Sequence, residues 1–72
     1  MEDNLTYHLA ILCRRIKVKR MLKGWTQKRL AQEIGFGADY INRIESGRRI
    51  PTLITLVKIA NALGCQPFKL LK

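Results

Sequence analysis

The sequence predicts an all-α fold, a compact domain of five helices built from residues 1–72. Apolar residues recur every three or four positions along most of the chain, which is the period of a helix with one buried face. Glycines interrupt this pattern at intervals, and no segment shows the alternation of apolar and polar residues that is typical of a strand. A chain of this length forms one domain with a small core.

The first two predicted helices are separated by Gly24, which ends the first of them. The first helix runs from about Thr6 to Leu22, after an acidic start, "MEDN", that we expect to fray. The second lies within "WTQKRLAQEIG", where Thr26 is a good N-cap and Gly35 ends the helix.

The third predicted helix lies within "FGADYINRIESG", with Gly37 as its N-cap and Gly47 as its end. Two short helices joined by a three-residue turn with glycine are the sequence pattern of a helix-turn-helix, here at about residues 26–47. A fourth helix, apolar on most sides, lies within "PTLITLVKIANALG", and a short fifth helix lies within "QPFKLL".

The excess of cations gives the first indication of function. The formal net charge is +9 with a pI near 10.3, and eleven of the fourteen Lys and Arg residues lie between Arg14 and Arg49. A polyanion is the expected partner, and nucleic acid is the default polyanion. The alternative is a charged surface that only keeps the domain in solution.

Other kinds of site find little support in the sequence. Cys13 and Cys65 do not have metal-ligand spacing, so we expect buried, reduced thiols, no metal or cofactor, and a reducing cytosol. His8 is the only histidine and has no nucleophile or ligand cluster beside it, so we expect no enzyme. No apolar run approaches the ~20 residues of a membrane span. Residues 9–23 could lie on a membrane surface only by exposing the face that the core requires.

Two opposite charges fall on faces that should be buried. Arg20 lies on the apolar line of the first helix, and Glu45 lies on the inward face of the third helix beside Ile41 and Ile44. Each charge would be costly to bury alone, but together they can form a bidentate pair. We predict an Arg20–Glu45 ion pair; the alternative is that Arg20 extends to solvent from the helix end. The apolar line that Arg20 continues is Leu9, Cys13 and Ile16.

Three segments resemble the phage-repressor/Cro-type (Xre-like) helix-turn-helix family, which has a lambda-repressor-like fold. They are "RIKVKRMLKGWTQKRLAQEIG", "YINRIESGRR" and "PTLITLVKIANALG", and the resemblance covers about residues 15–71. The predicted Arg20–Glu45 pair is similar to an Arg–Glu pair characteristic of this family. The resemblance implies a dimer that binds operator DNA with its third helix in the major groove.

The sequence departs from the family pattern in several places. The N-terminal extension through about Arg14 has no counterpart in the minimal family domain. Gly37 stands where Ser or Thr usually caps the third helix, and Phe68 stands where a polar residue is frequent. Ala38 and Asp39 stand at the start of the third helix, where the family often reads bases with Gln.

The outward face of the third helix carries the predicted base-reading residues. Arg43 is the expected reader of guanine, with a phosphate contact as the alternative. Asn42 suits either adenine or the DNA backbone, and Ala38 suits a thymine methyl group. Asp39 has three interpretations: a partner for the helix dipole, an acceptor for cytosine N4, or a carboxylate that orients Arg43 one turn away.

The predicted phosphate contacts flank this face. The family counterpart of Gln27 holds a phosphate at the start of the second helix, where free backbone N–H groups also attract anions. Arg48 and Arg49 follow the third helix in a loop. Tyr40 suits a phosphate, although it could instead be a packing residue. The predicted set is Gln27, Lys28, Tyr40, Ser46, Arg48 and Arg49, with Lys17 and Arg29 as weaker candidates.

We therefore expect a cytoplasmic, bacterial or phage-encoded repressor that binds a palindromic operator in double-stranded DNA as a homodimer, with residues 38–46 in the major groove. Because nothing follows the fifth helix, we expect the dimer interface on this domain, at Ile54, Phe68 and Leu71. The alternative is that these residues complete the small core. A second candidate surface is the N-terminal extension, at Leu5, Tyr7 and His8.

Two related roles are compatible with the same fold. An antitoxin would bind a toxin protein as well as its own operator. A restriction-modification controller would activate as well as repress, and its short length is similar to that of this chain. We expect no small-molecule ligand in any of these roles.

Overall fold

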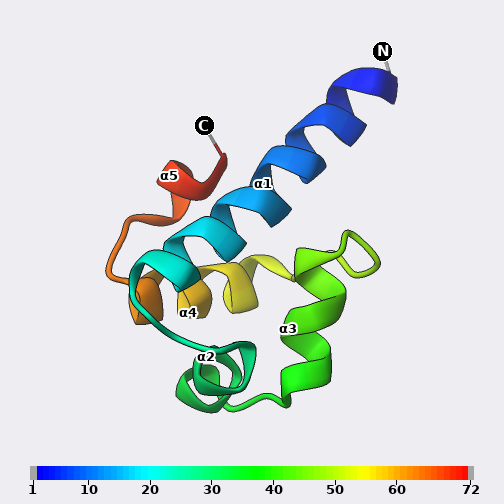
Figure 1. Cartoon of the computed structure of the whole chain (residues 1–72). Helices are drawn as coiled ribbons and strands as arrows, with labels where there is room; N and C mark the ends of the chain where they lie inside the picture. The colour runs from blue at the N-terminus through cyan, green and yellow to red at the C-terminus, as the bar shows by residue number, and fades with distance from the viewer. Residues whose placement is uncertain (1, 72) are drawn as a thin grey trace.

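The computed structural model describes residues 2–71, with side chains described for residues 5–70. The described residues form five helices and contain no strand, which confirms the predicted all-α fold (Figure 1). The helices are α1 (Glu2–Leu22), α2 (Gln27–Ile34), α3 (Ala38–Glu45), α4 (Leu53–Leu63) and α5 (Pro67–Leu71).

The long first helix differs from the prediction at its start. It begins at Glu2 and not near Thr6, so the segment that was expected to fray is helical. No glycine or proline occurs before Gly24, so the backbone has no residue that would interrupt the helix. Figure 1 shows the N-terminal turns of α1 extending beyond the other helices.

The core lies where α1, α2, α3 and α4 meet, and α5 covers one end of it. α2 packs against α3 and α4, and α1 packs against α3, α4 and α5. The buried apolar residues are Leu12, Ile16, Leu30, Ala31, Ile34, Ile41, Ile44, Leu56, Ile59, Ala60, Leu63 and Leu70.

Local signals place the helix ends close to their predicted positions. The Thr26 hydroxyl oxygen accepts a hydrogen bond from the backbone N–H of Arg29 at 3.0 Å, as an N-cap does. Gly35 ends α2 with a φ of 81°, a left-handed conformation that costs glycine little. Gly37 caps α3 without a side-chain hydrogen bond, and Thr52 caps α4 with one.

The buried line of α1 differs in part from the predicted one. Leu12, Ile16 and Arg20 are buried, whereas Leu9 and Cys13 are only half-buried. The buried residues are four positions apart and therefore lie in one row along the helix. The two cysteines, expected to be buried, are both free and half-buried, and partial burial raises the pKa of the Cys13 thiol above its ordinary value.

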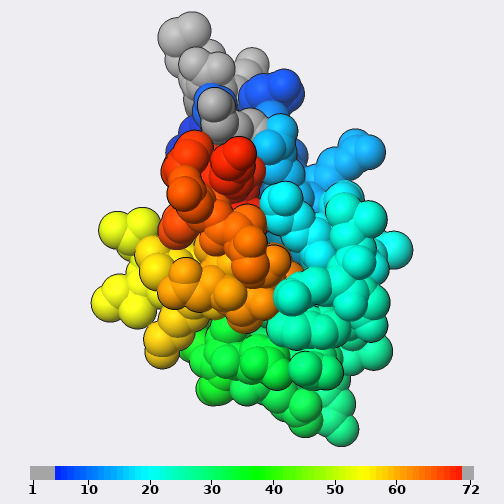
Figure 2. Space-filling model, turned by 90° about the vertical axis from the view of Figure 1, so that its left-hand side faces the viewer, coloured from blue at the N-terminus to red at the C-terminus, as the bar shows by residue number. Residues whose placement is uncertain are grey.

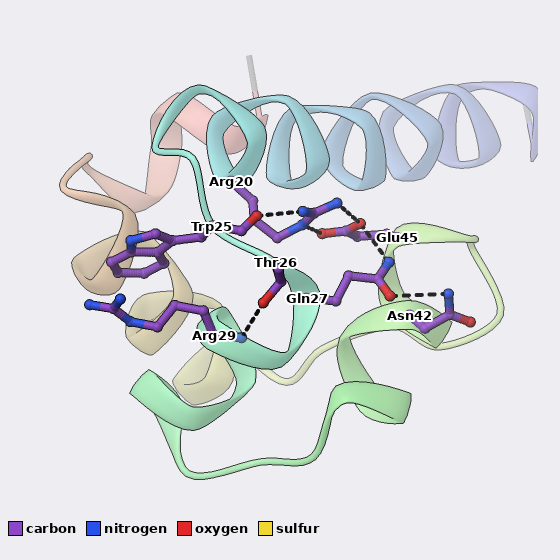
Figure 3. Close-up of polar contacts among 7 residues, drawn as sticks. All are labelled: Arg20, Trp25, Thr26, Gln27, Arg29, Asn42 and Glu45. Atoms are coloured by element: carbon purple, nitrogen blue, oxygen red, sulfur yellow. Dashed lines mark hydrogen bonds and ion pairs between the residues drawn. The ribbon is translucent and has the colours of Figure 1, made fainter.

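A bidentate ion pair joins α1 to α3, as the sequence predicts (Figure 3). Arg20 Nε donates to Glu45 Oε2 at 2.7 Å, and Arg20 Nη2 donates to Glu45 Oε1 at 3.0 Å. The two side chains are only 10% and 3% exposed. Arg20 Nη1 also donates to the backbone carbonyl of Trp25 at 2.7 Å, so the guanidinium holds α1, α3 and the segment before α2 together.

Replacing Arg20 with Met should lower the free energy of unfolding by ~3–5 kcal/mol, because the buried Glu45 carboxylate would lose its partner. The double variant Arg20→Met/Glu45→Leu should recover most of this loss, since it leaves no buried charge unpaired. Guanidinium-induced unfolding measures both effects.

The matched surface control is Glu33→Gln, which breaks the exposed Arg29–Glu33 pair. Its expected cost is ~0–1 kcal/mol. An Arg20→Met variant no less stable than this control would show that the buried pair does not constrain the fold.

Candidate nucleic-acid interface

One side of α3 faces the core, and the other side is open to solvent. Ile41, Ile44 and the carboxylate of Glu45 are buried on the inner side. The four residues predicted to read bases all lie on the exposed side: Ala38, Asp39, Asn42 and Arg43.

Asp39 forms an ion pair with Arg43 on this exposed side. Arg43 Nε lies 2.9 Å from Asp39 Oδ2, one helical turn away, and the two side chains are 51% and 75% exposed. This is the contact that the third interpretation of Asp39 requires. An exposed pair of this kind is weak, so it biases the conformation of Arg43 without locking it.

A chain of hydrogen bonds connects the buried ion pair to the same face (Figure 3). Gln27 Nε2 donates to Glu45 Oε1 at 3.0 Å, and Gln27 Oε1 accepts from Asn42 Nδ2 at 3.3 Å. Asn42 Oδ1 in turn accepts from Arg48 Nη2 at 2.9 Å. The amide of Asn42 is therefore held from both sides, and one N–H and one acceptor lone pair remain for an external partner.

The sequence did not predict this series of hydrogen bonds. It predicted phosphate contacts alone for Gln27 and Arg48. The half-buried position of Gln27 at the start of α2 brings its amide against α3. Helical spacing relates residues on one helix, but it does not relate Gln27 to Asn42 or a loop residue such as Arg48 to either helix. The one sequence feature that indicated a polar contact here was Gln27, a polar residue at the first position of α2.

The loop after α3 places its cations at the edge of the exposed face. Ser46 Oγ donates to the backbone carbonyl of Arg43 at 3.2 Å and accepts from Arg48 Nε at 3.0 Å. The Arg49 guanidinium lies over the ring of Tyr40, with its Cζ 5.4 Å from the ring centroid. Ser46, Arg48 and Arg49 are exposed, as phosphate contacts require.

The other predicted phosphate ligands differ in their surroundings. Tyr40 is half-buried and stacked on Phe36 with ring centroids 4.2 Å apart, which fits the packing alternative. Lys28 is exposed in the first turn of α2, and Lys17 is exposed on α1. Arg29 lies over the ring of Trp25 and pairs with Glu33, so its charge is already engaged within the protein.

The predicted dimer residues lie partly outside the core. Ile54 is 72% exposed and Phe68 is 50% exposed, while the side chain of Leu71 lies outside the described residues. Leu53, at the start of α4, is also exposed. Figure 2 shows the start of α4 and α5 on one face of the molecule. The second candidate surface, Leu5, Tyr7 and His8, is exposed as well.

Two other kinds of site are not found in the described part of the chain. It contains no helix whose length and apolar character would let it cross a membrane. It also contains no group of three or more His, Cys, Asp or Glu side chains that could hold a metal ion. The exposed face of α3 and its flanking cations are the candidate functional site, because polar groups converge there with defined geometry.

The sequence is similar to that of several regulators. Residues 16–70 match the helix-turn-helix family HTH_3. The chain is 47% identical over 45 residues to the uncharacterized HTH-type transcriptional regulator y4dJ of Sinorhizobium fredii. The matched segment covers 62% of this chain and 58% of that protein. It is 34% identical over 62 residues to the Neisseria hypothetical transcription factor of Neisseria meningitidis, covering 86% and 58%. The chain thus spans 58% of the length of each of these two relatives.

Two solved structures share the fold. The hypothetical transcription factor NHTF from Neisseria superposes with a TM-score of 0.85 at 33% identity, covering 89% of this chain and 74% of that one. The restriction-modification controller protein C.AhdI from Aeromonas hydrophila superposes with a TM-score of 0.82 at 32% identity, covering 86% and 94%. The chain therefore belongs to the Xre/Cro-like helix-turn-helix family, HTH_3, a family of DNA-binding transcription regulators.

Proposed function

We propose that this protein represses transcription by binding a palindromic operator as a homodimer, with residues 26–47 as its helix-turn-helix and α3 in the major groove. The observation that carries this proposal is the exposed face of α3, where Asn42 and Arg43 are both oriented by neighbouring side chains. Orientation before binding reduces the entropy lost when a side chain contacts a base.

The two oriented side chains suit different bases. Arg43 is free to present its guanidinium to guanine O6 and N7, which is the commonest specific contact in the major groove. Asn42 retains one donor and one acceptor, which is the pair that adenine N7 and N6 require. Asp39 acts as a positioning residue for Arg43. Arg48, Arg49 and Ser46 contact the phosphates at the groove edge, and they set the register of α3 without reading sequence.

The dimer is proposed to form through an apolar patch on α4 and α5, defined by Leu53, Ile54 and Phe68. Each of these side chains is exposed on a small, strongly basic domain, where an uncovered apolar patch usually marks an interface. In such a dimer the two α3 helices are proposed to occupy half-sites about one turn of DNA apart.

A narrower role is supported by one comparison. The chain shares its fold with 94% of the restriction-modification controller protein C.AhdI, with a TM-score of 0.82 at 32% identity. We propose control of a restriction-modification system as the first role to test. Genes for a nuclease and a methyltransferase beside this gene would support it, and their absence would count against it.

DNA binding should depend steeply on salt. Log K should fall with log salt with a slope of ~0.9 for each phosphate neutralised, because each contact releases a condensed counterion. Arg49→Gln, at a loop cation that makes no hydrogen bond to Asn42, should make this slope shallower while leaving the selected sequence unchanged. Fluorescence anisotropy titrations over a range of salt concentrations measure both, and an affinity that does not respond to salt would contradict phosphate contacts.

Arg43→Ala should relax the preference at one guanine position by ~1–3 kcal/mol, because the bidentate contact is lost. Asp39→Ala should weaken the preference at that same position by less, since it removes only the orienting carboxylate. Selection of bound sequences from random DNA measures both variants. If Asp39→Ala instead relaxes a separate cytosine position, then Asp39 reads a base directly.

Phe68→Asp should dissociate the dimer, because it places a charge in the centre of the apolar patch. The matched control is Leu22→Asp, which makes the same kind of change at an exposed apolar residue of α1 outside the patch. Sedimentation equilibrium measures the state of each variant. A Phe68→Asp variant that remains dimeric would move the interface elsewhere, with the N-terminal extension as the next surface to test.

A further inference from the structure

A groove runs between residues 6–17 of α1 and the loop of residues 46–51. Its volume is about 490 Å³. Its floor is mainly apolar, with Leu9 and Leu12 on one side and Ile50 and Pro51 on the other. Three cations line it as well: Arg14, Lys17 and Arg49.

Within residues 5–70, the part of the chain whose side chains are described, no acid forms an ion pair with Arg14, Lys17 or Arg49. The acidic side chains within residues 5–70 are Glu33, Asp39 and Glu45. Each of them forms an ion pair with a cation outside this set: Arg29, Arg43 and Arg20 respectively. Glu45 lines the groove, but its carboxylate is already bound by Arg20 and Gln27. The groove is therefore a positive cleft with low-dielectric walls, an arrangement that concentrates its field on an anion.

The cations of α1 divide between two sides of the helix. Arg14 and Lys17 are three residues apart and so lie next to each other at the groove. Arg15, by contrast, donates through Nη1 to the backbone carbonyl of Lys69 in α5, at 3.1 Å. Figure 1 shows that the loop after α3 lies on the side of α1 away from α5. The groove therefore has its own pair of α1 cations.

The groove is continuous with the proposed DNA-binding surface. It begins at Ser46 and Gly47, directly after α3, and it shares Arg49 with the loop that we assign to phosphates. A DNA strand that leaves the loop in this direction passes over Arg14 and Lys17. A DNA strand carries regularly spaced phosphates and would already be bound by the loop at one end of the groove. It therefore matches this row of cations better than a separate small ligand does.

We propose that this groove binds the backbone of duplex DNA outside the segment that α3 reads, with Arg14 and Lys17 contacting its phosphates. This proposal rests on the proposed operator binding, and it gives Arg14 and Lys17 of α1 a function that the helix-turn-helix alone does not include. The contacts add affinity and register without reading bases.

The experiment compares two duplexes that carry the sequence selected by the protein from random DNA. One duplex is trimmed to the selected positions, and the other extends by about one helical turn on each side. The wild-type protein should bind the extended duplex more tightly. Arg14→Gln/Lys17→Gln should lose this advantage, with a salt slope on the extended duplex lower by ~0.9 for each phosphate contact removed, and should bind the trimmed duplex as the wild type does.

Two control variants separate the groove from net charge. Lys19→Gln/Lys58→Gln removes the same charge at residues outside the groove and should keep the advantage of the extended duplex. Arg14→Lys/Lys17→Arg keeps both charges and should restore the advantage, because a phosphate accepts either cation. Thermal melts of all variants establish that they are folded, as expected for positions that are exposed or, at Lys19, half-buried.

The outcomes distinguish the two proposals. A wild-type protein that binds both duplexes equally, or a groove variant that keeps the advantage, would overturn the groove assignment and leave operator binding intact. Equal losses in the groove variant and in Lys19→Gln/Lys58→Gln would also overturn it, since net charge would explain them. A wild-type protein that selects no sequence would overturn operator binding and the groove assignment together.

Discussion

The buried ion pair between Arg20 and Glu45 is the interaction on which the rest of the structure depends. A carboxylate that is 3% exposed is tolerable only when each oxygen has a partner, and here Arg20 and Gln27 supply them. The requirement to satisfy Glu45 therefore fixes how α1 and α2 meet α3. It also extends outward, because the amide of Gln27 that serves Glu45 holds Asn42 with its other atom. The orientation of a surface residue thus follows from the cost of burying a charge.

The distribution of charge has a simple logic. The chain has a net charge of +9, and the three acids within residues 5–70, where side chains are described, each pair with one arginine. Of the cations outside these pairs, Arg48 and Arg49 lie in the loop after α3, and Arg14 and Lys17 lie on α1 beside that loop. The acid at the start of α3, Asp39, also fits this pattern. Although its carboxylate repels phosphate, it forms an ion pair with Arg43 one turn away and so favours one orientation of the Arg43 guanidinium.

Much of the fold could be predicted, because its signals are local. The N-caps Thr26 and Thr52, the helix end at Gly35 and the order of five helices follow from rules that act within a few residues. Less of the site could be predicted. The exposed face of α3 follows from its helical period, but the link from Gln27 through Asn42 to Arg48 joins three segments and depends on their distances in space. The choice of Leu12 over Leu9 for the buried line of α1 likewise depends on where α3 and α5 press against it.

The sequence by itself determined the order of the helices, the inward face of α3 and the pairing of Arg20 with Glu45, since periodicity and the cost of an unpaired buried charge leave few alternatives. Only the tertiary structure decided which polar groups converge on the exposed face, and which cations of α1 share a groove with the loop after α3. The physical reason is that helical spacing defines directions around one axis, whereas a binding surface depends on the relative placement of several axes. Core packing determines that placement through residues that never touch the partner.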